Sequence, residues 1–287
     1  EDLGRMPFEV VRENGQDVVK PNGDSNVQLG SGYKQLDVLE KLRYRSGKHV
    51  AHQLNLQLST SSDVPRYDRL STYTMDSAGS YVPRFAQWYY GPQQRVLAAY
   101  RLEVDKEASW YDKARFTPCW QHQEQTRHNR RFGSSNLGHN IEQVDVLGFS
   151  ADMEKRIGRH ELRYGGDLSG EEVESSAYNE DIDTGTRTYR TTRYPNGGTT
   201  MSSFAAYVNH SLEYSPKLIF TEGLRFTHVS LHTTFNDGED FRFLNGTYAQ
   251  NNAALTWRAG VVWMPGSDWR FSLLGSSGFR APNVDDI

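Results

Sequence analysis

The sequence contains little from which a helical membrane protein or a disulfide-rich protein could be built. Its one cysteine, Cys119, excludes an internal disulfide, and no CxxC pair indicates a metal or redox site. No segment approaches the roughly 18 consecutive apolar residues that a transmembrane helix needs, and the mean hydropathy is −0.73. The net charge of −4 gives no indication of a nucleic-acid partner, because such partners usually require a basic patch.

Recognisable catalytic motifs are also missing. Ser, His and Asp occur, but the sequence has no nucleophile elbow, HExxH pair or phosphate-binding loop. We therefore predict that the protein is not an enzyme and holds no resident cofactor or metal. The first residues, 1–4, are neither basic nor followed by an apolar core, so no signal peptide opens the chain.

A two-residue periodicity dominates the chain. From Val50 to Ser59, mostly apolar residues at even positions alternate with mostly polar residues at odd positions. Successive side chains of a strand point to opposite faces, so the segment has one apolar and one polar face. The pattern recurs and predicts about ten strands, near 31–44, 50–59, 95–105, 114–128, 143–155, 160–170, 202–214, 218–232, 254–264 and 269–274.

The predicted strands are joined alternately by short and long connections. Short links fall at 45–48, 107–109, 157–159, 215–217 and 265–268, and long polar segments at 60–93, 129–141, 172–200 and 235–251. Membrane β-barrels have such tight turns on one side and long loops on the other. Several predicted strands also reach the ~9–11 residues that cross a bilayer.

Aromatic residues lie close to the predicted short turns, as in the aromatic girdles of membrane barrels: Tyr44, Trp110, Trp120, Tyr214, Trp263 and Trp269. Glu40 and Glu222 are exceptions to the pattern, because they fall in the apolar phase of their strands. We expect each to lie near a membrane interface or beside a bulge that shifts the phase. Residues 1–28 have no clear pattern and are expected to form a loop. These features predict an all-β fold, the wall of an antiparallel transmembrane β-barrel.

The segment Gly278–Asn283 contains the tetrapeptide FRAP at Phe279, Arg280, Ala281 and Pro282. This tetrapeptide resembles a box of TonB-dependent receptors, and in particular of haem and haemoglobin receptors. The segments 204–208 and 223–226 resemble the family's repeated hairpin, and 64–70 and 88–93 resemble loop and strand-entry sequences of such receptors. The resemblance extends over most of the chain from about residue 31.

The resemblance implies a receptor in the cell outer membrane that imports haem or haemoglobin-derived iron. Its partners would be outer-membrane lipid, a haem protein at the extracellular face, and the TonB complex, which acts through a plug domain. Such barrels have ~22 strands. We therefore expect residues 1–287 to be part of one barrel domain, with the plug and the C-terminal strands outside the chain.

The resemblance makes Phe279, Arg280, Ala281 and Pro282 candidate ligand contacts. His128 and His139 flank a predicted long loop and are candidates as well, because imidazole binds haem iron. Other candidates, each better explained as ordinary loop or surface residues, are His122, His228 and His232, the basic residues Arg127, Arg130 and Arg131, and the acidic segment 171–183.

Three alternatives remain open. A ferric siderophore or cobalamin receptor would have the same barrel. A soluble propeller or surface adhesin would bind without transport, but propeller blades repeat in sequence and no such repeat is found. A barrel enzyme would need a Ser/His pair on its wall, and none is evident.

Overall fold

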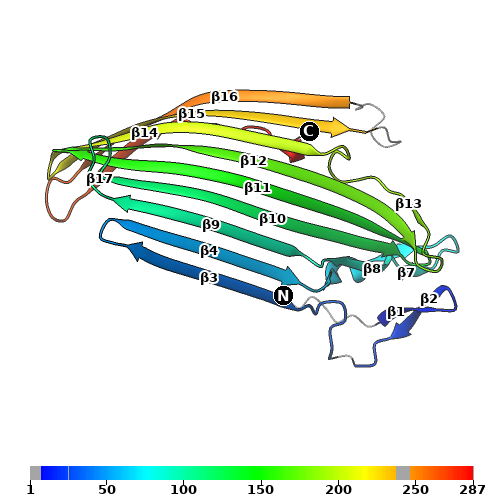
Figure 1. Cartoon of the computed structure of the whole chain (residues 1–287). Helices are drawn as coiled ribbons and strands as arrows, with labels where there is room; N and C mark the ends of the chain where they lie inside the picture. Colours follow the sequence, from blue (N-terminus) through cyan, green and yellow to red (C-terminus); the bar gives the residue numbers. More distant parts are fainter. Residues whose placement is uncertain (1–7, 25, 237–245, 287) are drawn as a thin grey trace.

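The computed structural model describes residues 8–24, 26–236 and 246–286, and one 13-stranded antiparallel sheet dominates it. Ten of its strands follow one another as a meander (Figure 1). In spatial order these are β3 (Gln35–Ser46), β4 (Val50–Ser61), β9 (Gln94–Asp105), β10 (Lys113–Arg131), β11 (Asn136–Ile157), β12 (His160–Asp181), β14 (Thr199–Ser215), β15 (Leu218–Phe235), β16 (Gly246–Trp263) and β17 (Phe271–Ser276). The predicted all-β class, the antiparallel pairing and the ten strands are confirmed, and among the described residues the sheet does not close into a barrel.

The two ends of the sheet differ, and we name them by their connections. At the short-turn end, tight turns join β3 to β4 and β11 to β12, where Gly47 and Gly158 have φ of +77° and +61°. Glycine adopts this left-handed conformation without a steric penalty. The opposite end, the long-loop end, carries the longest connections, such as residues 62–93 between β4 and β9.

Strands β10, β11 and β12 contain 19, 22 and 22 residues. Since ~9–11 tilted residues cross a bilayer, these strands are about twice the length that a membrane requires. The predicted loop at 129–141 is therefore wrong, because only residues 132–135 separate β10 from β11. Much of the predicted loop at 172–200 is also strand, since β12 extends to Asp181. Part of the predicted loop at 235–251 lies outside the described residues.

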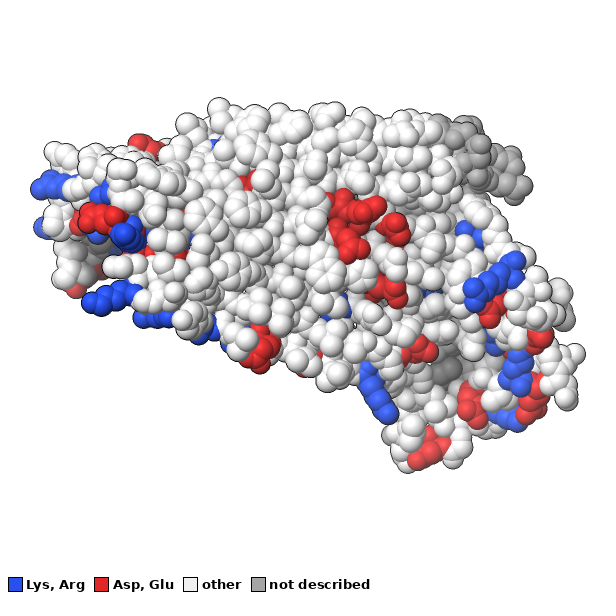
Figure 2. All heavy atoms as spheres, in the orientation of Figure 1, with Lys and Arg blue, Asp and Glu red and all other residues white. Residues whose placement is uncertain are grey.

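One face of the sheet is apolar across neighbouring strands. The register places Phe149 opposite Leu168 and Leu168 opposite Phe204, and farther along it places Leu224 opposite Trp257. Such side chains are left uncovered, as Leu255 at 66% exposure illustrates. The sheet curls so that β17 lies behind the middle strands in Figure 1. Figure 2, from the same side, shows a band almost free of charged residues between charged groups at the two ends. We call this face the convex face and its uncharged zone the apolar band.

The opposite, concave face is polar. Arg115 lies opposite Asp152, Arg163 opposite Asn209, and Gly223 opposite Arg258. The alternation predicted from the sequence thus separates two chemically different surfaces, each formed by every second residue.

A tyrosine on the concave face joins three strands. The Tyr207 hydroxyl on β14 donates to Asp152 on β11, passing over Gly165 on β12. A Cβ atom at Gly165 would collide with the Ala151 carbonyl oxygen and approach the Tyr207 hydroxyl to 2.9 Å. Glycine is therefore required at this crossing.

Most of the predicted aromatic girdle is confirmed in position. Tyr44, Tyr214 and Trp269 lie at or beside the short turns and are 67%, 60% and 67% exposed. Trp120 is an exception, because it lies well inside β10, opposite Leu147 and next to the acidic border of the apolar band.

Segments outside the meander gather at the long-loop end. The expected loop before residue 28 instead contains a hairpin, β1 (Phe8–Glu13) and β2 (Gln16–Pro21). The connection between β4 and β9 holds β5 (Val64–Pro65), α1 (Tyr67–Leu70), β6 (Tyr73–Met75), β7 (Tyr81–Pro83) and β8 (Phe85–Tyr90), and β13 (Arg187–Tyr189) pairs with β12. No helix among the described residues is long and apolar enough to cross a membrane.

The β1–β2 hairpin is held by a buried ion-pair network. The Asp17 carboxylate accepts hydrogen bonds from Arg130 at 2.8 Å, from Arg12 at 3.2 Å and from the backbone N–H of Gly133 at 2.7 Å. The side chains of Asp17 and Arg130 are 0% and 3% exposed. The network fixes the hairpin to the tip of β10–β11, and Arg12 also reaches Asp183 beyond the end of β12.

Candidate ligand-binding site

The FRAP residues leave the sheet after β17. Ser277 still pairs with Trp257, and residues 278–283 then lie outside any strand and lead into a short 3-10 helix, Val284–Asp286. The Arg280 guanidinium donates to both carboxylate oxygens of Asp286 at 2.8 Å. This segment lies behind the sheet in Figure 1, on the concave side. Ligand contact by Phe279, Arg280, Ala281 and Pro282 stays a prediction.

His128 and His139 lie opposite each other on β10 and β11, in the phase of the convex face. Their Nδ1 atoms are 2.7 Å apart, and their rings lie between Tyr89 and Tyr178, with ring centroids 4.7 and 4.5 Å from them. Burial lowers the pKa of both imidazoles, and His128 further lowers that of His139. His128 is only 8% exposed. The structure brings these two predicted residues together, but in a packed stack on the side opposite to the FRAP segment.

The clearest constellation on the concave face was not predicted, and it surrounds Arg190. After β13 the chain crosses back over β10–β12, and Arg190 donates to the side-chain oxygens of Asn140, Asn179 and Asn129 at 3.1, 3.0 and 3.3 Å. A Cβ atom at Gly138 would collide with this guanidinium. Burial, then the charge of Arg127, lowers the Arg190 pKa. We call residues 187–195 the strap.

Two further arginines and one carboxyl group complete this constellation. Glu142 on β11 is 8% exposed, and its Oε1 atom is buried without a hydrogen-bond partner among the described residues. Burial raises its pKa, while the charges of Arg127 and Arg193 oppose that rise. The strap region contains three guanidinium groups, and burial favours the neutral form of its one carboxyl group. The net charge of the region is therefore positive. Because guanidinium groups bind carboxylates and phosphates strongly, this region can bind an anion.

The other candidates divide between the two faces. In the predicted acidic segment, Glu171, Glu172, Glu174, Glu180 and Asp181 belong to β12 rather than to a loop. Together with Glu124 and Asp145, Glu172 and Glu174 lie in the convex phase, where Figure 2 shows an acidic group bordering the apolar band. His122 bonds to Asp145 at 3.0 Å. His232 accepts or donates a 3.1 Å bond with Ser230.

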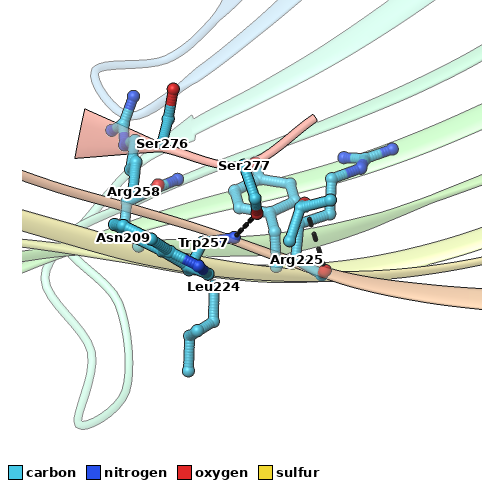
Figure 3. A pocket seen from close by; sticks show the side chains of 10 residues that line it. Asn209, Leu224, Arg225, Trp257, Arg258, Ser276 and Ser277 are labelled. Carbon is cyan, nitrogen blue, oxygen red and sulfur yellow. Dashed lines mark hydrogen bonds between the residues drawn. The ribbon is translucent and has the colours of Figure 1, made fainter. Parts of the chain in front are cut away.

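Nearer the short-turn end, the concave face contains two adjoining cavities of about 510 and 320 Å³ that share Tyr207, Asn209 and Arg258. In Figure 3, Arg258 and Ser276 extend to the same side of β16 and β17, while Leu224 points the opposite way.

Within residues 8–24, 26–236 and 246–286, no group of three or more His, Cys, Asp or Glu side chains is arranged to hold a metal ion.

Comparison with known protein families matches residues 43–287 to the family described as "TonB dependent receptor-like, beta-barrel". The chain belongs to this receptor family. The predicted resemblance is thereby confirmed at the family level, over most of the chain. No curated protein sequence matches the chain.

Solved structures agree in fold. The ferric citrate transporter FecA superposes with a TM-score of 0.62 at 14% identity, covering 86% of this chain and 36% of FecA. The copper transporter OprC gives 0.64 at 10% identity, covering 84% and 36%. The ferric yersiniabactin receptor FyuA from Yersinia pestis gives 0.58 at 13%, covering 85% and 37%. The chain thus spans little more than a third of each receptor. At these identities the likeness establishes the fold alone, so the haem subtype stays a prediction.

Proposed function

We propose that the protein lies in the outer membrane and imports a negatively charged iron chelate in a TonB-dependent manner. The observation that supports this proposal best is the strap region, where Arg127, Arg190 and Arg193 gather on the concave face of a receptor-family barrel wall. Ferric citrate and ferric yersiniabactin, named for two of the similar structures, are chelates of the siderophore type. The long-loop end would then be extracellular.

The membrane placement rests on the apolar band. Exposed Leu, Phe and Trp side chains follow neighbouring strands on the convex face, while the concave face carries ions. Lipid on one side and a water-filled interior on the other explain both surfaces. In this proposal TonB acts on a plug domain outside residues 1–287, which would occupy the concave side.

Haem or haemoglobin iron is the second candidate cargo. The FRAP tetrapeptide favours it, and the haem propionates would also suit the arginines of the strap region. The buried stack around His128 and His139 does not favour it, because neither imidazole is open to a planar ligand on the concave side. In both cases we expect the whole receptor to act as a transporter and not as an enzyme.

The test uses the whole receptor in a strain that lacks its own copy of the gene. Uptake of radioactive iron is measured from ferric citrate, a ferric catecholate and haem. We expect Arg127→Gln and Arg190→Gln to lower uptake of the cognate chelate about tenfold or more, because hydrogen bonds to charged groups contribute ~1.5–3 kcal/mol. Arg187→Gln is the matched control, since Arg187 belongs to the strap but pairs with Glu180 and lies over Tyr178.

Equal uptake of all three compounds with and without the gene would reject the proposed import. Loss of haem uptake alone, with siderophore uptake intact, would select the second candidate. Unchanged uptake in both concave-face variants would mean that the strap region is not the binding site.

A further inference from the structure

Three hydrogen-bonding side chains form a polar island on the convex face. His160 on β12 meets His210 on β14 at 2.9 Å between Nδ1 and Nε2, and His210 Nδ1 meets Glu222 Oε1 on β15 at 2.8 Å. The two imidazoles stack, with centroids 5.1 Å apart and planes 12° from parallel. Glu222 was one of the two charges that interrupted the predicted apolar pattern.

A change of strand phase does not explain this island. β15 pairs regularly with β14 and β16 around Glu222, and the register shift lies farther on, between Glu213 and Ser215. The neighbours of Glu222 in the same phase of β15 are Phe220 and Leu224. Its side chain is 65% exposed. Placed against lipid, an ionised carboxylate is costly, and such residues are commonly functional.

The island borders the short-turn end. His160 is the first residue of β12, directly after the turn at 157–159, and the register sets it opposite Leu212 on β14. Arg159 in this turn donates to the Tyr214 carbonyl oxygen at 2.9 Å. In the proposed membrane placement, headgroups would meet the sheet at this level, close to the cationic Arg159 and to the acceptor groups of the island.

The proton positions along the island follow from the carboxylate. An ionised Glu222 only accepts hydrogen bonds, so His210 donates through Nδ1 and, when neutral, accepts through Nε2. His160 must then donate through Nδ1, which leaves its Nε2 as an acceptor. The free Glu222 oxygen is an acceptor as well. With Glu222 ionised and both imidazoles neutral, the island thus presents a lone pair at His160 and a negatively charged oxygen at Glu222.

We propose that this island binds the ammonium group of phosphatidylethanolamine in the leaflet that covers the short-turn end. A primary ammonium carries three hydrogen-bond donors and a positive charge, which match the Glu222 carboxylate that His210 holds through its Nδ1 atom. The adjacent Arg159 provides a cation for the phosphate of the same zwitterionic headgroup. The acyl chains lie against the apolar band. This inference rests on the proposed membrane placement but not on the identity of the cargo.

The experiment uses the whole receptor reconstituted in nanodiscs of equal phosphatidylethanolamine and phosphatidylglycerol, then released for native mass spectrometry. We expect the wild-type receptor to retain phosphatidylethanolamine in preference, and Glu222→Gln and His210→Phe to reduce that preference about tenfold. Glu213→Gln is the matched control. Glu213 lies near the same end of β14 as His210, but it is in the concave phase and pairs with Arg156. Retention in this variant should equal that of the wild type.

The folding of every variant is checked by the gel shift that a folded barrel shows on heating. A loss of lipid preference is interpreted only for receptor that is folded. Equal retention of the two lipids by the folded wild type would overturn the proposal, as would an unchanged preference in Glu222→Gln. Loss of the preference on adding EDTA would also overturn it, because a bridging metal ion would then be the ligand. A receptor that stays in solution without detergent would instead reject the membrane placement itself.

Discussion

The apolar band and the long-loop end are formed by the same strands but are stabilised differently. Within the band, the convex side chains lie bare, and Leu255 and Leu273 are 66% and 74% exposed. At the long-loop end, Arg130, Asn140 and Glu142 are almost fully buried beneath a hairpin or strap. In the proposed membrane placement the band depends on the surrounding lipid, whereas the long-loop end depends on specific contacts between protein groups.

This difference decides what each region tolerates. Replacing one band residue by another apolar residue changes little, because hydrocarbon adapts to the new shape. Removing one group of a buried polar network leaves its partner unsatisfied, and this is strongly destabilising. Three substitutions test the contrast.

The largest effect should follow from Asp17→Ala. Breaking a buried ion pair by removing one partner typically costs ~3–5 kcal/mol, and Arg130 would be left with its charge buried at the tip of β10–β11. Cleavage of the β1–β2 hairpin by protease on intact cells should therefore accelerate strongly. Glu13→Ala is the control, because the Glu13–Lys20 pair is exposed on both sides and such pairs contribute ~0–1 kcal/mol. Equal protection of both variants would show that the network does not hold the hairpin.

A smaller effect should follow from Leu255→Arg in the apolar band. Arginine on the lipid face of a barrel is destabilising by ~2–4 kcal/mol near mid-membrane. Thr256→Arg, on the adjacent concave residue, should be close to neutral because its side chain faces polar neighbours. The measurement is the denaturant midpoint of the receptor in lipid vesicles. If both substitutions lower it equally, the assignment of the two faces is wrong.

The smallest effect should be the pH dependence of the strap. Burial raises the Glu142 pKa above its usual 4.5, so the folded state holds the proton more tightly than the unfolded state does. Stability is then greatest below pH 4.5 and falls as pH rises to the folded pKa. Hydrogen exchange at residues 187–195 should quicken across that window, and Glu142→Gln should remove the dependence. If hydrogen exchange, corrected for its intrinsic rate, slows as the pH rises, the predicted direction of the stability change is wrong.

Sequence reasoning succeeded where one face of the sheet is apolar and the other polar. The strands from Val50 and from Leu218 were placed within a residue or two at the short-turn end, because the pattern there reports one apolar and one polar face. Beyond the band both faces are polar or covered by protein, so the alternation disappears although the strand continues. The extensions of β10, β11 and β12 were consequently interpreted as loops.

The β1–β2 hairpin was missed despite a usable signal. Asn14 and Gly15 both have positive φ, 49° and 76°, which is the requirement of the two-residue turn that Asn-Gly favours. The strap had no such signal. Its contacts join Arg190 to Asn129, Asn140 and Asn179 across long sequence separations, and no local pattern encodes them. His128 and His139 were predicted to flank a long loop, but they lie opposite each other within β10 and β11. Their phase along the strands, which sets them on the convex face, was not used.

The crossing of Tyr207 over Gly165 bears on the curvature of this part of the sheet. A bent sheet has less area on its inner surface than on its outer one, so bulky inner side chains must spread across strands or be absent. Where glycine leaves the inner surface free, the neighbouring Tyr207 hydroxyl can cross β12 and tie β11 to β14. Gly165→Val should therefore break the Tyr207–Asp152 tie between β11 and β14 and let this part of the wall flatten.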